Sequence, residues 1–127
     1  MNLLLDTHIL LWAAADPAKL SSETTNLISN KDNRLYFSAA SIWEVVIKNG
    51  LHRPDFFVDS HILRRGLVDN GYLELPISTQ HTLALSHLPD IHKDPFDRLL
   101  VSQAICRGLS ILTPDPLIHM YPARWEW

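Results

Sequence analysis

Four short apolar runs, separated by segments with helical spacing, constrain the fold of this chain most strongly. The runs cover residues 3–5, 35–37, 72–75 and 110–113. The first has no polar alternation, which is typical of a strand covered on both faces, and no hairpin signal joins any two runs. This order predicts a three-layer α/β/α fold with a mostly parallel four-stranded sheet and right-handed crossovers. A fifth short strand is expected near residues 124–127.

Capping signals delimit the helices between the runs. We expect helices over residues 9–15, from Ser21 or Ser22 to residue 28, from a Ser41 cap to residue 50, and over residues 59–70 and 79–88. Asp94 and Pro95 are expected to open a further helix that ends at residue 107, with Gly108 as a left-handed cap.

Length and composition are those of a single globular domain. The chain has 127 residues, of which 46% are hydrophobic and 20% charged, so we expect one domain over residues 1–127. No apolar stretch approaches the ~20 residues of a membrane helix, and a lone cysteine, Cys106, fits a reducing compartment. We therefore expect a cytoplasmic protein without a membrane partner. With a net charge of −3, the overall electrostatic field of the chain does not attract an anionic substrate, so such a substrate would need a local feature that binds it.

Acidic residues follow the predicted strands. Asp6 comes directly after the first strand and Asp115 after the fourth, so both are expected at the carboxyl edge of the sheet, where open α/β folds bind ligands. Glu44, Asp94 and Asp97 lie near helix starts that are expected at or near the same edge. Four or five carboxylates could converge in one pocket.

Clustered carboxylates repel one another and call for a cation. Oxygen ligands without a cysteine or a histidine pair select a hard ion, Mg²⁺ or, as a substitute, Mn²⁺. The chemistry that such ions support here is hydrolysis of a phosphoryl group or a phosphodiester, and the ion would also attract the substrate phosphate. The pattern thus indicates a metal-dependent phosphodiesterase.

Four motifs in order resemble the PIN domain, and more narrowly the VapC-like toxins of toxin-antitoxin pairs. They are Leu-Leu-Leu-Asp-Thr-His at residues 3–8, Ser-Ala-Ala-Ser-Ile-Trp-Glu-Val at 38–45, His-Lys-Asp-Pro-Phe-Asp-Arg-Leu-Leu-Val-Ser-Gln-Ala at 92–104, and Leu-Thr-Pro-Asp at 112–115. Together these motifs span nearly the whole chain.

The resemblance implies a Mg²⁺-dependent endoribonuclease that is the toxin of such a pair. Its acidic quartet, catalytic and metal-ligating, would be Asp6, Glu44, Asp97 and Asp115, with Asp97 as the third acid because Ala104 follows it by seven residues. Asp94, Thr7 and Thr113 are additional candidates for the site. The resemblance also implies an RNA substrate, a homodimer, and a small VapB-like antitoxin whose tail occupies the active-site groove.

Each acid also has a structural interpretation. Ser41 and Glu44 form a capping-box pattern, and Asp94 with Asp97 fits an N-cap and first-turn acid. Asp6 is harder to explain structurally, since an unpaired acid after a buried strand loses hydration. Thr7 could cap a helix instead of contacting a ligand, and Thr113 is equally ambiguous.

The histidines, tryptophans and basic residues have structural interpretations beside any functional ones. The scattered histidines are expected on the surface or in loops, with His8 and His92 beside the acidic motifs and able to contact RNA. The four tryptophans are assigned to core or interface. The candidate phosphate contacts are Arg64, Arg65, Arg98 and Lys48, although hydrated positions on helix faces explain these residues at least as well.

Two rival functions stay open. One is a phosphoaspartate enzyme, either a phosphatase or a receiver domain, although His8 stands where such a phosphatase has its second aspartate. The other is a metal-binding or interaction module without catalysis.

Overall fold

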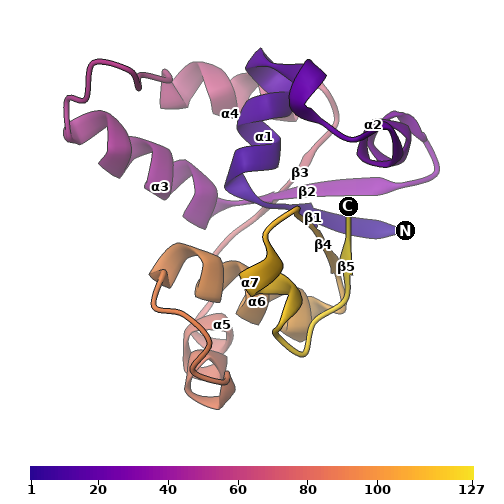
Figure 1. The fold of residues 1–127 in the computed structure, drawn as a ribbon, viewed down its shortest axis with the longest axis vertical. Helices are drawn as coiled ribbons and strands as arrows, with labels where there is room; N and C mark the ends of the chain where they lie inside the picture. The colour runs from indigo at the N-terminus through magenta and orange to yellow at the C-terminus, as the bar shows by residue number, and fades with distance from the viewer.

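A computed structural model describes residues 1–127 as a five-stranded parallel sheet with helices on both faces (Figure 1). The elements in chain order are β1 (Asn2–Leu5), α1 (Thr7–Ala15), η1 (Pro17–Lys19), α2 (Ser22–Ser29), β2 (Arg34–Ser38), α3 (Ala39–Gly50), α4 (Ser60–Asp69), β3 (Leu73–Leu75), α5 (Thr79–Ala84), η2 (Leu85–His87), α6 (Pro95–Arg107), β4 (Ser110–Leu112), α7 (Pro116–His119) and β5 (Trp125–Glu126). The predicted α/β/α architecture and the fifth strand are confirmed.

The strand order in the sheet is β3-β2-β1-β4-β5, and every neighbouring pair is parallel. The chain builds outward from β1 through β2 to β3, and then returns to place β4 on the other side of β1. The strand order therefore reverses between β1 and β4. Open α/β sheets bind their ligands at the carboxyl ends of the strands at such a reversal.

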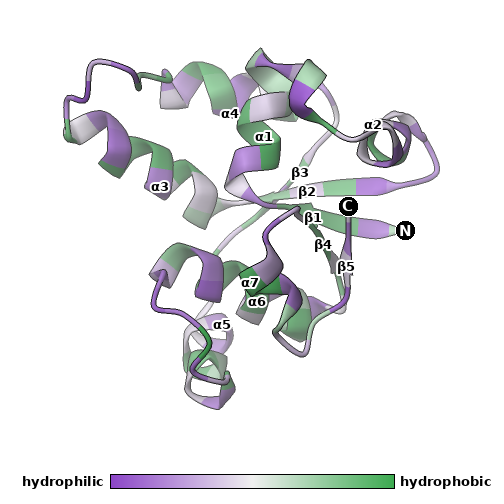
Figure 2. Cartoon of the chain, viewed as in Figure 1, coloured by the Kyte–Doolittle hydropathy of each residue, from purple (hydrophilic) through white to green (hydrophobic).

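Side-chain alternation along β1 divides the core into two halves. Leu4 packs on one face of the sheet with residues of α6, whereas Leu3 and Leu5 pack on the other face with residues of α1 and α4. In Figure 1, α1 to α4 cover one face of the sheet and α5 to α7 the other. Figure 2 shows the hydrophobic residues of β1 between these two helical layers, so the central strand is buried from both sides.

Most predicted helix boundaries are confirmed. Ser21 caps α2, Asp59 caps α4 and Asp94 caps α6, each by accepting hydrogen bonds from backbone N–H groups. Gly108 ends α6 in the left-handed region with φ 66°, where a side chain would be strained.

Three boundaries differ from the predictions. The first helix, α1, begins at Thr7 because Asp6 caps it, so Thr7 is not an N-cap. The third, α3, begins at Ala39 with Ser38 as its cap, so the predicted Ser41 cap and its box with Glu44 are wrong. The segment 79–88 is shorter than expected, since a 3₁₀ turn follows α5 at Leu85–His87. None of the helices is long and apolar enough to cross a membrane.

Candidate active site

Asp6 lies at the reversal of strand order, immediately after β1. Its residue exposure is only 4%, and its backbone N–H donates to Leu112 O of β4 at 3.2 Å. One carboxylate oxygen, Oδ1, accepts from the Ile9 N–H at 2.9 Å, and Oδ2 accepts from the Thr113 hydroxyl. Capping of α1 therefore accounts for one oxygen of Asp6. This is a structural role that the sequence had not suggested for this residue.

Asp115 follows β4 and reaches the same edge of the sheet. Its Oδ1 caps the short helix α7 by accepting from the Leu117 N–H at 2.9 Å. Its backbone N–H donates to Thr113 Oγ1 at 3.1 Å, and that hydroxyl in turn donates to Asp6. Thr113 thus links the two strand-end acids by hydrogen bonds, which is one of the two roles that the sequence left open for it.

Asp94 and Asp97 bring two further carboxylates to this edge from the start of α6. Asp94 Oδ1 accepts from the backbone N–H groups of Phe96 and Asp97, at 2.9 and 3.1 Å. Asp97 Oδ2 lies 3.1 Å from His92 Nε2. Asp94 is therefore the N-cap expected from the sequence, whereas Asp97 is held by a histidine side chain.

The electrostatics show that these acids interact. Burial raises the pKa of Asp97 to about 6; the His92 hydrogen bond opposes this rise, and the charges of Asp94, Asp115 and Asp6 add to it. Burial also raises the pKa of Asp6, against the hydrogen bonds from Thr113 and Ile9, and the Asp115 charge adds to the rise. Four of the five sequence-predicted acids thus share one electrostatic environment with too little positive charge.

Glu44 is placed by α3 and is held differently. It is 5% exposed, and Lys48, one turn further along the helix, pairs with its Oε2 at 2.9 Å. Its Oε1 is buried without any hydrogen-bond partner. A buried oxygen without a hydrogen-bond partner destabilises the folded state by about 1–3 kcal/mol. A cation or a hydrogen-bond donor next to Glu44 Oε1 would remove this destabilisation.

The Thr7 side chain makes no hydrogen bond to an acid. Its hydroxyl donates to Ser41 Oγ at 2.9 Å. Ser41 lies inside α3, one turn before Glu44, so Thr7 joins the start of α1 to the Glu44 helix.

The donor set suits a hard cation. In Glu44, Asp94, Asp97 and Asp115, one carboxylate oxygen is held by a neighbouring group and the other takes no intramolecular hydrogen bond. All of these donors are oxygens, which are the ligands that Mg²⁺ and Mn²⁺ prefer. No three His, Cys, Asp or Glu side chains are yet arranged to hold an ion. Binding would have to draw the carboxylates closer, and an ion would favour this because it replaces their repulsion with attraction.

Comparison with known protein families gives a match over nearly the whole chain. The family model described as "PIN domain" matches residues 3–120. The chain belongs to the PIN domain family. A comparison with curated proteins finds no match.

The fold of this PIN domain is also similar to that of several solved structures. A chain of VapBC2 from Rickettsia felis, bound to a DNA fragment from its promoter, matches with TM-score 0.71 and 17% identity, covering 99% of this chain and 98% of that one. A chain of VapBC-1 from nontypeable Haemophilus influenzae matches with TM-score 0.61 and 17% identity, covering 99% and 97%. A chain of VapBC-5, of the VapBC family of toxin-antitoxin systems, from Mycobacterium tuberculosis matches with TM-score 0.60 and 15% identity, covering 98% and 95%. The sequence-based resemblance to a PIN domain is confirmed.

Several other predictions can be compared with the PIN domain structure. His81 is not a surface histidine, since it is 4% exposed and its Nδ1 accepts from the Ser78 N–H at 3.1 Å. Three of the candidate phosphate contacts are engaged within the chain. Arg64 pairs with Glu74 and Lys48 with Glu44, and Arg98 donates to Pro89 O and to the Tyr121 hydroxyl. Trp43 is 52% exposed and packs edge-to-face on Phe96, with ring centroids 5.0 Å apart. It is therefore not a core residue.

Sequence reasoning missed one residue of the acidic edge and the full role of another. His92 was expected beside the acids, but not as the hydrogen-bond partner of Asp97. Tyr121, whose hydroxyl lies 2.7 Å from His92 Nδ1, was not singled out at all. The proximity of His92 to the acidic motif was the only available signal, because Tyr121 lies 29 residues away in the chain.

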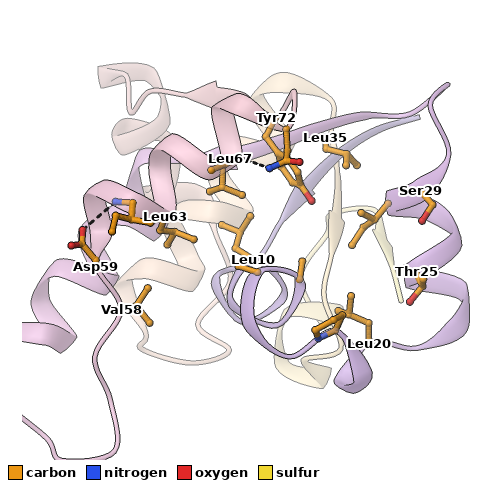
Figure 3. Close-up of a pocket in the computed structure, with 17 residues that line it drawn as sticks. Leu10, Leu20, Thr25, Ser29, Leu35, Val58, Asp59, Leu63, Leu67 and Tyr72 are labelled. Atoms are coloured by element: carbon orange, nitrogen blue, oxygen red, sulfur yellow. Dashed lines mark hydrogen bonds between the residues drawn. The ribbon is translucent and has the colours of Figure 1, made fainter.

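One cavity of this PIN domain lies apart from the acidic edge. It has a volume of about 750 Å³ and is lined mainly by apolar residues of α1, α2 and α4, such as Leu10, Ile28 and Leu63 (Figure 3). None of the seven candidate site residues lines it. Its apolar walls do not suit a polyanionic substrate, so the chemistry is assigned to the acidic edge.

Proposed function

We propose that this PIN domain is a metal-dependent endoribonuclease that hydrolyses RNA phosphodiester bonds as the toxin of a toxin-antitoxin pair. The observation that carries the proposal is the electrostatic coupling of four acids at the point where the strand order reverses. Burial raises the pKa of Asp97 to about 6 and the charges of Asp94, Asp115 and Asp6 add to the rise, so a bound cation would stabilise these carboxylates in their ionised form.

The residues divide by role. Asp6, Asp97 and Asp115 would hold one or two Mg²⁺ ions, with Mn²⁺ as a substitute. Glu44 would help to ligate an ion or orient the attacking water, since its Oε1 is buried and unpaired. When bound, Mg²⁺ would neutralise phosphate charge and lower the pKa of a coordinated water. Asp94 holds the first turn of α6 and adds negative charge.

The reaction that follows is an in-line displacement at phosphorus. The oxygen of water attacks, a P–O bond forms, and the bond from phosphorus to the ribose O3′ breaks. One product therefore carries a 5′-phosphate and the other a 3′-hydroxyl after its oxygen takes up a proton. The ribose 2′-hydroxyl takes no part, so a substrate with a 2′-deoxy or 2′-O-methyl sugar at the cleaved position should keep its chemical reactivity.

The proposed partner is a small VapB-like antitoxin. Support comes from the solved structures, which are VapBC toxin-antitoxin assemblies with the same fold. An arginine of the antitoxin tail could enter the acidic edge and pair with the carboxylates in place of the metal ion. Inhibition would then follow from replacement of one positive charge by another.

A homodimer is also proposed. Trp43, Val46 and Ile47 of α3 are 52%, 49% and 41% exposed, and adjacent exposed apolar residues are typical of an interaction surface. Light scattering of the purified chain should give twice the mass of 14.5 kDa. A Val46→Lys variant should give the monomer mass.

The central experiment incubates purified, antitoxin-free protein with RNA and Mg²⁺, with and without EDTA. We expect cleavage that EDTA abolishes and that is lost in Asp6→Asn. The matched control is Asp32→Asn, because Asp32 is exposed in the turn before β2 and the same charge is removed. Analysis of the product ends tests for 5′-phosphates.

The same experiment addresses the non-catalytic alternative, a metal-binding or interaction module. Binding of Mn²⁺ without RNA cleavage would support an interaction module and overturn the nuclease. Equal cleavage by Asp6→Asn and the wild-type protein would point to a contaminating ribonuclease and would remove the assignment of Asp6.

A further inference from the structure

We infer that His92 is a positioning residue for the Asp97 carboxylate and that Tyr121 and Arg98 orient its ring for this task. The inference rests on the proposed function, because it assigns Asp97 to the metal site. It adds a role for three residues outside the acidic set, and these come from the loop before α6, from α6 itself and from the segment between α7 and β5.

The contacts form a chain that ends at Asp97. His92 Nε2 lies 3.1 Å from Asp97 Oδ2, and His92 Nδ1 lies 2.7 Å from the Tyr121 hydroxyl. Arg98 Nη1 donates to the same hydroxyl at 3.0 Å and to Pro89 O at 2.9 Å. The guanidinium carbon also lies 5.8 Å from the centre of the Tyr121 ring.

The chemistry of these groups assigns a direction to each hydrogen bond. A carboxylate only accepts, so His92 Nε2 must carry a proton and donate to Asp97. In a neutral ring Nδ1 is then an acceptor, and the Tyr121 O–H donates to it. Arg98 can only donate, and it occupies a lone pair of the Tyr121 oxygen. Both ring nitrogens of His92 and the Tyr121 hydroxyl are therefore hydrogen-bonded, with the His92 tautomer set by its neighbours.

The surroundings restrict the movement of this chain. The Tyr121 residue is 3% exposed and belongs to the core cluster that includes Leu4. The His92 and Asp97 side chains are only 14% and 22% exposed. Asp97 Oδ2 is thus held through His92 by an anchor in the core, while Oδ1 takes no hydrogen bond within the chain and is free to ligate.

A purely structural role for His92, pinning the loop before α6, predicts a different outcome from a positioning role. Loss of a structural hydrogen bond lowers the free energy of unfolding alone. Loss of a partner that orients a ligating carboxylate lowers metal affinity, typically 10- to 100-fold. Mn²⁺ affinity, measured by calorimetry on the full chain, therefore separates the two roles.

The experiment compares four variants with the wild type. His92→Ala and Tyr121→Phe should weaken Mn²⁺ binding about 10- to 100-fold. At saturating Mn²⁺, they should lower kcat for RNA cleavage more than they change KM. His92→Gln should restore most of the affinity, because its amide can donate to Asp97 from a similar position. His87→Ala, at an exposed histidine in η2, should bind Mn²⁺ like the wild type.

Each result has a defined meaning. Wild-type Mn²⁺ affinity in both His92→Ala and Tyr121→Phe overturns the inference while leaving the nuclease intact. Failure of the wild type to bind Mn²⁺ overturns both. If His92→Ala does not fold, Tyr121→Phe decides the question, because it removes one hydroxyl and keeps the ring in the core; its unfolding curve is recorded beside its affinity.

Discussion

Replacement of Asp97 by asparagine should stabilise the metal-free protein at neutral pH. A pKa of about 6, raised first by burial and then by nearby acids, compares with an ordinary value of 3.8. That difference corresponds to about 3 kcal/mol of unfavourable free energy when Asp97 is ionised in the folded state. Asparagine removes the charge and can still accept from His92, but it loses about 0.3–1 kcal/mol of helix-dipole stabilisation at the start of α6. The expected net gain is about 2 kcal/mol.

The pH dependence has a definite sign. Because the folded-state pKa lies above the unfolded-state value, the unfolded chain releases the Asp97 proton first as pH rises. This contribution to wild-type stability is therefore complete below about pH 4 and is lost between about pH 4 and 6. The advantage of Asp97→Asn should grow over that interval and stay constant above it.

Urea unfolding in EDTA, followed by circular dichroism at several pH values, measures this effect. Asp32→Asn is the control, since Asp32 is exposed in the turn before β2 and the same charge is removed. Addition of Mg²⁺ at 100 times its dissociation constant should stabilise the wild type by about 2.7 kcal/mol and Asp97→Asn far less. If Asp97→Asn is no more stable than the wild type at pH 7.5 in EDTA, the ionised Asp97 side chain is not destabilised by burial and by its acidic neighbours, and the prediction is refuted.

Three further predictions concern stability. Burial lowers the pKa of His81 below 6.5, and the Arg107 charge adds to this. The free energy of unfolding should therefore fall as pH drops below about 6.5, because the unfolded chain gains the proton first. Urea unfolding from pH 7.5 to 5 should show a smaller fall in His81→Gln than in the wild type. Gly66→Ala should raise the free energy of unfolding by about 0.5–1 kcal/mol, since Gly66 lies within α4 and an added Cβ meets nothing within 4 Å. An unchanged urea midpoint would contradict this prediction. Leu4→Ala, in the fully buried centre of β1, should cost about 2–5 kcal/mol in the same assay, whereas a loss below 1 kcal/mol would mean that the core closes around the gap.

Some helix starts could be predicted because the signal is local. Asp94 followed by Pro95 predicts the start of α6, and the Asp94 side chain accepts from the backbone two and three residues later. The start of α3 was misplaced because residues 38–41 include two serines, Ser38 and Ser41, and either could cap a helix. Ser38 is the cap, and its hydroxyl also donates a hydrogen bond to Gln103 Oε1 on α6 at 2.5 Å. No local sequence pattern reveals this contact.

The candidate site shows the same division. Asp6 and Asp115 could be placed at one edge because each directly follows, or nearly follows, a predicted parallel strand. The misplaced start of α3 changes the meaning of Glu44, because a residue in the second turn is no capping-box partner. Its pairing with Lys48 spans one helical turn and was detectable in principle, whereas its unpaired Oε1 depends on everything packed around it.

The sequence by itself determined the alternation of strands and helices, the parallel sheet and the positions of the acids at strand and helix ends. These properties depend on hydrophobic periodicity and on hydrogen bonds between residues a few positions apart. Only the tertiary structure decided that Asp97 carries a raised pKa and that the Tyr121 hydroxyl meets His92. Desolvation and long-range contacts depend on which surfaces pack together, and a linear pattern does not contain that information.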